Sequence, residues 1–139
     1  MRIIVDTNVF VSGIFWSGAS YRILKAWQQD KISLVVSQEI IDEYERVGKN
    51  LSEKYSSIDI DIAPFLQLVA IYAEFYVPCK LEKAISRDSD DDKFIACALA
   101  ANVKVIVSGD KDLLCLLNYG NIEILSPASF VKKYSKYLI

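Results

Sequence analysis

The sequence contains no histidine among its 139 residues. Because imidazole is missing, the chain cannot form a Ser-His-Asp or Cys-His catalytic site, or a zinc site with histidine ligands. A general acid or base in this protein must therefore be a carboxylate, a lysine, a tyrosine or a metal-bound water.

Cysteine is scarce, and the three copies, Cys79, Cys97 and Cys115, show no CxxC or other metal-ligand spacing. An odd number of cysteines in a chain without a secretory signal favours buried free thiols over a disulfide framework. We therefore expect neither a redox role nor a metal role for them.

Long apolar runs and an excess of positive charge are also missing. No hydrophobic stretch approaches the roughly 18–20 residues that span a bilayer, and the N-terminus shows neither a long hydrophobic region nor a small-residue cleavage site. The formal net charge is −2, which argues against a general polycation that binds DNA. We expect a cytoplasmic protein without membrane contact.

The residues that are present predict a single α/β domain over residues 1–139. The hydrophobic content of 53% is enough for a real core. Short aliphatic runs predict strands at residues 2–5, 34–36, 76–77, 104–107 and 122–125. Helices are predicted at residues 20–30, from 37 onwards, at 62–75, 90–101 and 111–117, and from 127. This alternation indicates a three-layer α/β/α fold with a parallel sheet of about five strands.

Turns and caps give further local predictions. The segment from Val9 to Ser20 contains two Ser-Gly pairs and is predicted to form turns around apolar residues, and polar residues 49–60 are predicted to connect two helices. Ser37 is the predicted N-cap of the helix that follows it. Asn102 is the predicted C-terminal cap of the helix at residues 90–101.

Aspartates follow two of the predicted strands. Asp6 comes directly after Ile3-Ile4-Val5, and Asp110 comes after Val105-Ile106-Val107-Ser108-Gly109. Ligands of open α/β sheets bind just outside the carboxyl ends of the strands. Either residue could instead cap a helix or form an Asx-turn, but two of them in one sheet favour a functional site.

A second acidic cluster, Asp88-Ser89-Asp90-Asp91-Asp92, precedes the apolar helix of Phe94. The helix macrodipole explains one or two aspartates at a helix start, whereas four within five positions repel one another. Asp91 lies three residues before Phe94 and shares its inward face. We predict Asp91 as the inward ligand, with Asp90 and Asp92 in supporting or solvent-facing positions.

Two further carboxylates each have two interpretations. Glu43 shares a helical stripe with Ile40 and Val47, so it is either paired at a site or extends from the edge of the stripe into solvent. Asp112 either caps a short helix or contributes a fourth ligand.

Carboxylates that meet from distant parts of a chain need a cation between them. Oxygen ligands without histidine or cysteine select Mg²⁺ or Mn²⁺. Such a site activates water and neutralises charge on a phosphate group, so phosphodiester hydrolysis is the predicted chemistry. Five basic residues either contact the phosphate backbone or are solvated surface charges: Arg22, Lys25, Arg46, Lys93 and Lys111.

Four segments together resemble the PIN domain family over essentially the whole chain. Each segment is weak alone, but the ordered set is specific, and it is most similar to the prokaryotic branch of toxins from toxin–antitoxin pairs. The segments are Ile4-Val5-Asp6-Thr7-Asn8-Val9, Ser37-Gln38-Glu39-Ile40-Ile41-Asp42-Glu43-Tyr44, Arg87-Asp88-Ser89-Asp90-Asp91-Asp92-Lys93-Phe94 and Val107-Ser108-Gly109-Asp110-Lys111-Asp112-Leu113.

The resemblance implies a metal-dependent ribonuclease with an acidic pocket. It also implies a homodimer or higher homo-oligomer and, in many relatives, a small antitoxin protein that blocks the site. By position, the family's acidic motif falls on Asp6, Glu43, Asp91 and Asp110, its polar supporting positions fall on Thr7, Asn8 and Ser108, and Asp112 is often acidic in this branch.

The leading hypothesis is a Mg²⁺- or Mn²⁺-dependent endoribonuclease that acts on single-stranded RNA. Asp6, Asp91 and Asp110 would hold the metal, and Glu43 would be a further ligand or a base that orients water. The alternative is a metal- and RNA-binding interaction module without turnover. A phosphoaspartyl phosphatase with Asp6 as nucleophile usually needs a second carboxylate two residues on, where this chain has Asn8.

Overall fold

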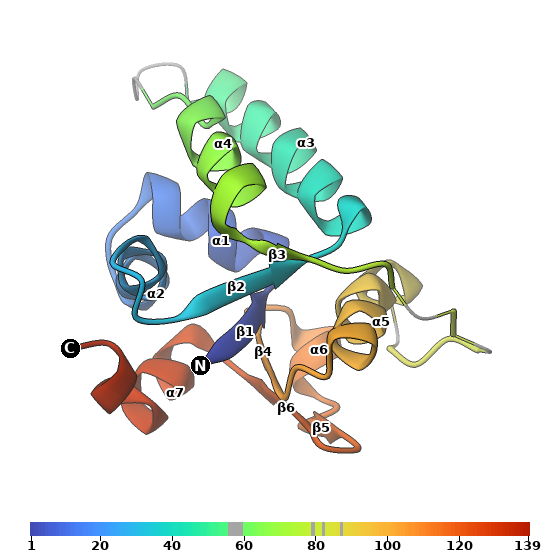
Figure 1. The fold of residues 1–139 in the computed structure, drawn as a ribbon. Coiled ribbons are helices and arrows are strands. Elements are labelled where there is room, and N and C mark those ends of the chain that lie inside the picture. Colours follow the sequence, from blue (N-terminus) through green and yellow to red (C-terminus); the bar gives the residue numbers. More distant parts are fainter. Residues whose placement is uncertain (56–59, 79, 82, 87) are drawn as a thin grey trace.

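A six-stranded sheet forms the centre of the protein (Figure 1). The computed structural model describes residues 1–55, 60–78, 80–81, 83–86 and 88–139. The sheet order is β3-β2-β1-β4-β6-β5, and all neighbours are parallel except β5 and β6. The strands are β1 (Arg2–Val5), β2 (Ser33–Val36), β3 (Glu74–Phe75), β4 (Val105–Val107), β5 (Asn118–Tyr119) and β6 (Ile122–Leu125).

Helices cover the sheet on both faces, which confirms the predicted α/β/α fold. In Figure 1, α1, α2 and α7 lie on one side of the sheet and α5 and α6 on the other, while α3 and α4 pack together near β3. Their bounds are α1 (Thr7–Phe15), α2 (Ala19–Gln28), α3 (Gln38–Lys54), α4 (Ala63–Tyr72), α5 (Asp92–Ala101), α6 (Lys111–Leu114) and α7 (Pro127–Lys133), with 3₁₀ turns η1 (Ser89–Asp91) and η2 (Ser135–Tyr137). Among the described residues, no helix is both long and apolar enough to cross a bilayer.

The central strands are apolar throughout because both faces of the sheet are covered. Ile3, Ile4 and Val5 of β1 and Ile106 and Val107 of β4 are all 0% exposed. Their burial fixes the position of β1 and β4 at the centre of the core, and with it the place where the chain leaves each strand.

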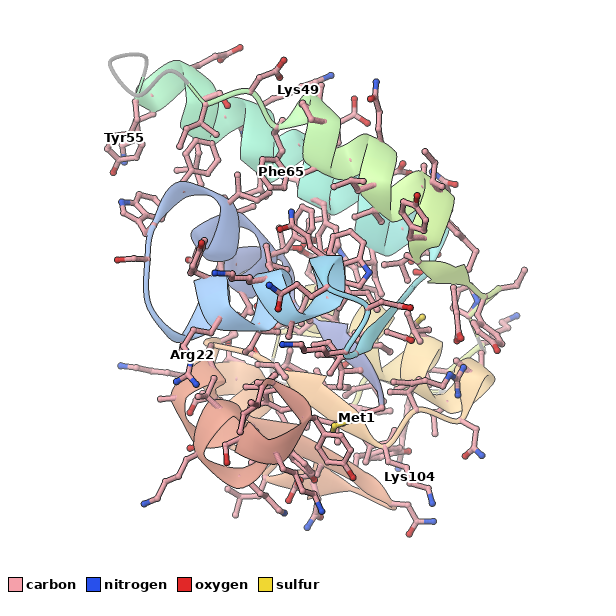
Figure 2. All side chains as sticks on the ribbon, turned by 60° about the vertical axis from the view of Figure 1, so that its left-hand side comes forward. Met1, Arg22, Lys49, Tyr55, Phe65 and Lys104 are labelled. Atoms are coloured by element: carbon pink, nitrogen blue, oxygen red, sulfur yellow. The ribbon has the colours of Figure 1, made fainter. Side chains whose placement is uncertain are left out.

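The carboxyl ends of β1 and β4 meet at one edge of the sheet. Val5 is aligned with Val107, and the amide of Asp6 donates to the carbonyl of Val107 at 2.9 Å. Met1 and Lys104, which precede the two strands, lie at the opposite edge (Figure 2). Asp6 and Ser108 therefore leave the sheet together.

The turn predicted at the second Ser-Gly pair is confirmed, because Ser17 and Gly18 connect α1 to α2 and Gly18 has a φ of 116°. The turn predicted at the first pair is wrong, because Ser12 and Gly13 belong to helix α1. Asp6 is its N-cap and accepts from the amide of Val9 at 2.9 Å. Gly13 does not form a turn; it lets α1 approach α2, since a Cβ on Gly13 would lie only 2.6 Å from Cδ1 of Leu24.

Three further boundaries differ from the sequence prediction. Helix α3 continues to Lys54, whereas residues 49–60 were predicted to be a connection, of which residues 56–59 lie outside the described part. Helix α4 ends at Tyr72 rather than residue 75, and β3 is Glu74–Phe75 rather than residues 76–77. Pairing fixes this strand, because Glu74 is aligned with Val35 and its carboxylate binds Nε of Arg2 at 2.7 Å.

The antiparallel strand β5 was not predicted. Helix α6 ends at Leu114 rather than Leu117, which adopts a positive φ of 57°, and β5 then pairs with β6. Gly120 turns the chain between them, also with a φ of 57°. A Gly-Asn pair between two short strands is a recognised hairpin signal, and here it was the available clue.

The predicted caps and thiols have mixed outcomes. Ser37 accepts from the amide of Ile40 at 3.3 Å and caps α3, and Asn102 ends α5 in the left-handed conformation, so both cap predictions are confirmed. Cys97 is buried as predicted, Cys115 is exposed against the prediction, and Cys79 lies outside the described residues.

We expect Gly13→Ala to lower the free energy of unfolding by about 1–3 kcal/mol. The added methyl group would lie 2.6 Å from Cδ1 of Leu24 and 2.8 Å from the carbonyl oxygen of Ser20. Urea titration followed by circular dichroism measures the change. Gly109→Ala is the control, since a Cβ there meets no described heavy atom within 4 Å apart from its own chain neighbours. Equal losses in both variants would contradict close packing of α1 on α2.

Candidate functional site

A cavity of about 190 Å³ opens at the carboxyl edge of the sheet, beside the ends of β1 and β4. The start of α1, one face of α3, the start of α5 and the turn after β4 form its wall. The structure thus brings all four residues predicted as catalytic into one cavity. The lining residues are Asp6, Thr7, Asn8, Glu43, Arg46, Val47, Asp88, Asp90, Asp91, Phe94 and Asp110.

Asp6 is only 3% exposed and is fixed through both of its carboxylate oxygens. Oδ1 accepts from the amide of Val9, and Oδ2 accepts from the hydroxyl of Ser108. Burial raises the pKa of Asp6 above its usual value, although these two hydrogen bonds act to lower it. Asp6 therefore caps a helix and lines the cavity at the same time.

Ser108 joins the two aspartates that follow the strands. Its hydroxyl group donates to Asp6 and accepts from the amide of Asp110 at 2.9 Å. Oδ1 of Asp110 in turn accepts from the amide of Asp112 at 2.8 Å, so Asp110 caps α6. The capping role considered for Asp6 and Asp110 from sequence is real, and it leaves both side chains on the cavity wall.

Asp91 and Asp92 have different surroundings although they are neighbours in sequence. Asp91 lines the cavity, and its Oδ2 is buried with no hydrogen-bond partner among the described residues. Asp92 accepts from the amides of Ile85 at 2.9 Å and Ser86 at 2.7 Å. Asp91 therefore faces the site, and Asp92 anchors the loop that leads to it.

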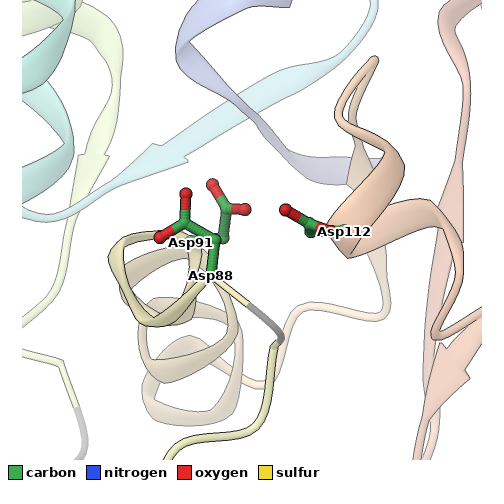
Figure 3. A group of neighbouring side chains, drawn as sticks. All are labelled: Asp88, Asp91 and Asp112. Carbon is green, nitrogen blue, oxygen red and sulfur yellow. The ribbon is translucent and has the colours of Figure 1, made fainter.

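Two carboxylates outside the predicted metal set converge on Asp91. Asp88, Asp91 and Asp112 each place one oxygen within 4.8 Å of the others, close enough to hold a metal ion. Figure 3 shows Asp88 and Asp91 approaching from the start of α5 and Asp112 from α6. Asp88 was missing from the predicted site residues; its spacing of three from Asp91 is the signal that could have identified it, because a helical turn places such residues on one face.

Glu43 reaches the cavity from α3, and both of its oxygens are engaged. Oε1 accepts from the hydroxyl of Thr7, and Oε2 pairs with Nζ of Lys93. Nη2 of Arg46 lies 3.8 Å from the same Oε2 atom. Glu43 is thus paired inside the protein rather than extended into solvent.

Two cations lie beside these acidic groups in the described structure. Nζ of Lys93 is also 3.2 Å from Oδ1 of Asp90, whose side chain is 68% exposed. Burial lowers the pKa of Lys93, but the hydrogen bonds and charges of Glu43 and Asp90 outweigh it and raise the pKa. Arg46 is 65% exposed and lines the cavity, whereas the other four predicted phosphate contacts do not: Arg22, Lys25, Lys93 and Lys111.

The aspartates of the cavity repel one another. Burial, followed by the charges of Asp110 and Asp88, raises the pKa of Asp91 to about 7, with smaller contributions from a side-chain hydrogen bond with Asp110 and from the charge of Asp6. Without a cation, Asp91 is therefore protonated in a large fraction of molecules at neutral pH. A cation near its Oδ2 would favour the ionised form.

A larger cavity, of about 450 Å³, lies away from this site. It contains one carboxylate, that of Asp30, and no lysine or arginine, so its lining offers no comparable chemistry. Its lining residues are Trp27, Gln28, Asp30, Ile32, Ser33, Leu68 and Tyr72.

Comparison with models of protein families matches residues 2–112 to the family described as PIN domain. The match runs from β1 into α6 and includes every lining residue of the acidic cavity. A search of curated proteins finds no match to the chain.

We expect Asp91→Asn to raise the melting temperature of the metal-free protein at pH 8. A carboxyl group whose pKa is raised to about 7 on folding contributes stability below its unfolded pKa, and that contribution is lost as the pH rises through about 7. The gain from the substitution should therefore grow between about pH 4 and 7 and then level off. Thermal melts in EDTA at several pH values measure it.

Asp42→Asn is the matched control for that experiment, because Asp42 is exposed on α3 and its carboxylate accepts a hydrogen bond from the side chain of Gln38 at 2.8 Å. Its effect should not grow with pH in the same way. A uniform loss of stability in Asp91→Asn at every pH would show that Asp91 is not under electrostatic strain.

Proposed function

Because the chain belongs to the PIN domain family, we propose that it is a divalent-metal-dependent endoribonuclease that hydrolyses phosphodiester bonds of single-stranded RNA. Family membership supports a nuclease, and hence a hydrolase, that uses a divalent metal ion. The observation that carries the proposal is the buried Oδ2 of Asp91, which has no partner among the described residues although several carboxylates surround it.

The donor set fits a hard divalent cation. The candidate ligands are carboxylate oxygens, and the chain has no histidine, which favours Mg²⁺ or Mn²⁺ over zinc. We propose Asp6, Asp91 and Asp110 as the residues that hold it. Asp88 and Asp112 lie close enough to Asp91 to extend this set.

A divalent cation bound there supplies positive charge that attracts a phosphate group and offsets the negative charge that develops during in-line attack by water. The surrounding residues fix the acidic groups in place. One hydroxyl, that of Ser108, links Asp6 to the turn of Asp110. Thr7 orients Glu43, which is either a further ligand or the group that orients the attacking water.

A single strand of RNA suits the dimensions of this cavity, provided that a divalent cation offsets the negative charge of its carboxylates. A flexible strand can bend one phosphodiester into a recess of about 190 Å³, whereas a regular duplex holds its backbone on a rigid surface. Arg46 at the rim offers a positive charge to the neighbouring phosphate. Asn8, which is exposed on the cavity wall, offers an amide group.

We further propose a cellular role as the toxin of a toxin–antitoxin pair, acting in the cytoplasm as a homodimer or higher homo-oligomer and bound by a small antitoxin protein. The support is the resemblance of the four sequence segments to that branch of the family. Induced expression should then arrest growth, and Asp110→Asn should not. Normal growth with active enzyme in the cell would contradict the toxin role alone.

We expect the purified protein to cleave single-stranded RNA with Mg²⁺ or Mn²⁺ and to lose this activity in EDTA. Asp6→Asn and Asp110→Asn should each lower kcat/KM at least about 100-fold, because each removes a charged oxygen from the metal site. Asp42→Asn removes the same charge from the exposed side of α3 and should retain activity. Cleavage of a fluorescent oligonucleotide measures all four proteins.

Two results would count against the nuclease. Cleavage that persists in EDTA, or full activity of Asp6→Asn, would contradict the metal-dependent mechanism. Tight binding of RNA without cleavage in the presence of Mn²⁺ would favour the alternative, a non-catalytic metal- and RNA-binding module.

A further inference from the structure

Glu43 and Lys93 form an ion pair whose role the proposed reaction leaves open. Lys93 lies in the first turn of α5 and Glu43 lies in α3, 50 residues earlier in the chain. Their side chains are each only 13% exposed. Partly buried charges that pair across two elements interact more strongly than the exposed pairs of a helix surface.

The pair leaves neither oxygen of Glu43 without a partner. Oε2 pairs with the ammonium group of Lys93, and Oε1 accepts from the hydroxyl of Thr7. A metal ion that binds Glu43 directly must compete with the ammonium group of Lys93, and such a bond between charged groups is stronger than the bonds from neutral donors that hold Asp6. Oδ2 of Asp91, in contrast, is buried without a partner among the described residues.

We propose that Lys93 is a positioning residue that keeps Glu43 from binding the metal directly. The cation is held by the aspartates, and Glu43 stays beside it, fixed by Lys93 and Thr7, as the group that orients water. This inference rests on the proposed function, because it presumes that the cavity binds a divalent ion, and it decides between the two roles open to Glu43.

The proposal makes a prediction that a simple structural role does not share. If Lys93 only anchored the start of α5, its removal would loosen the site and weaken metal binding. If Lys93 restrains Glu43, its removal frees a carboxylate that becomes an additional ligand, so the metal should bind more tightly. A plain loss of positive charge would also tighten binding, but that effect would not depend on Glu43.

A double-mutant cycle separates these three cases. Binding of Mn²⁺ to the wild type, Glu43→Gln, Lys93→Gln and the double variant is measured by calorimetry, and free Mn²⁺ is measured by electron paramagnetic resonance. We expect Lys93→Gln to bind Mn²⁺ at least about threefold more tightly, since a freed carboxylate adds a charged ligand. Glu43→Gln and the double variant should both stay within about twofold of the wild type.

Two further variants serve as controls. Lys93→Arg keeps the charge and the donor and should bind Mn²⁺ like the wild type. Lys49→Gln removes the same charge from α3, where Lys49 lies far from the sheet (Figure 2) and its Nζ is 2.6 Å from Oε1 of Glu45 in an exposed pair. This variant should also leave Mn²⁺ binding unchanged.

Three outcomes would overturn the inference: weaker binding in Lys93→Gln, tighter binding that persists in the double variant, or a loss of about tenfold or more in Glu43→Gln. If Lys93→Gln does not fold by circular dichroism, the Glu43→Gln result alone decides, because unchanged affinity supports the proposal and lost affinity refutes it. A wild-type protein that binds no Mn²⁺ would overturn the proposed function itself, which keeps the two failures distinguishable.

Discussion

The alignment of β1 with β4 is the constraint on which the acidic site depends. Val5 lies opposite Val107, so Asp6 and Ser108, which are 102 positions apart, leave the sheet side by side. Val107 is in turn aligned with Leu125 of β6, which fixes β4 from its other side. A shift of the β1–β4 register by one residue would turn the side chains of the shifted strand to the opposite face. The carboxylates are thus gathered by a buried apolar core and cannot relieve their repulsion by moving apart.

Packing behind the cavity holds α3 against this edge. The hydroxyl of Tyr44 donates to the carbonyl of Val5, and its ring stacks on Phe10 with the centroids 4.2 Å apart. Tyr44 is 0% exposed, so the neighbouring Glu43 has little freedom to withdraw from the site. Contacts in the core therefore hold together a cavity whose like charges destabilise the folded state, which is a common feature of functional sites.

Features that depend on residues close together in the sequence could be predicted from it, whereas features that depend on contacts between distant residues could not. The apolar runs before Asp6 and Asp110 indicate buried strands that end at polar residues, and the alternation of such strands with predicted helices is enough to predict the three-layer fold. Asp88 and Lys93 each have one partner that is distant in sequence, because Asp112 comes from α6 and Glu43 from α3, and only the complete fold brings these partners near. Helix α1 was not predicted for a related reason. From the sequence alone, Gly13 is typical of a turn, and only the close approach of α2 explains why a glycine lies within a helix.

The aspartates of the site show that structural and functional interpretations of one residue need not compete. Capping a helix uses one lone pair of a carboxylate, and an ionised carboxylate has about four. Asp6 and Asp110 can therefore cap α1 and α6 and still present oxygen atoms to the cavity, with the caps fixing their positions. Oδ2 of Asp91 has no such duty within the described structure, and burial with neighbouring charge raises the pKa of this residue to about 7. Asp91 is therefore the carboxylate that we expect to lose its proton when a cation binds, while Asp6 and Asp110 remain in place as helix caps.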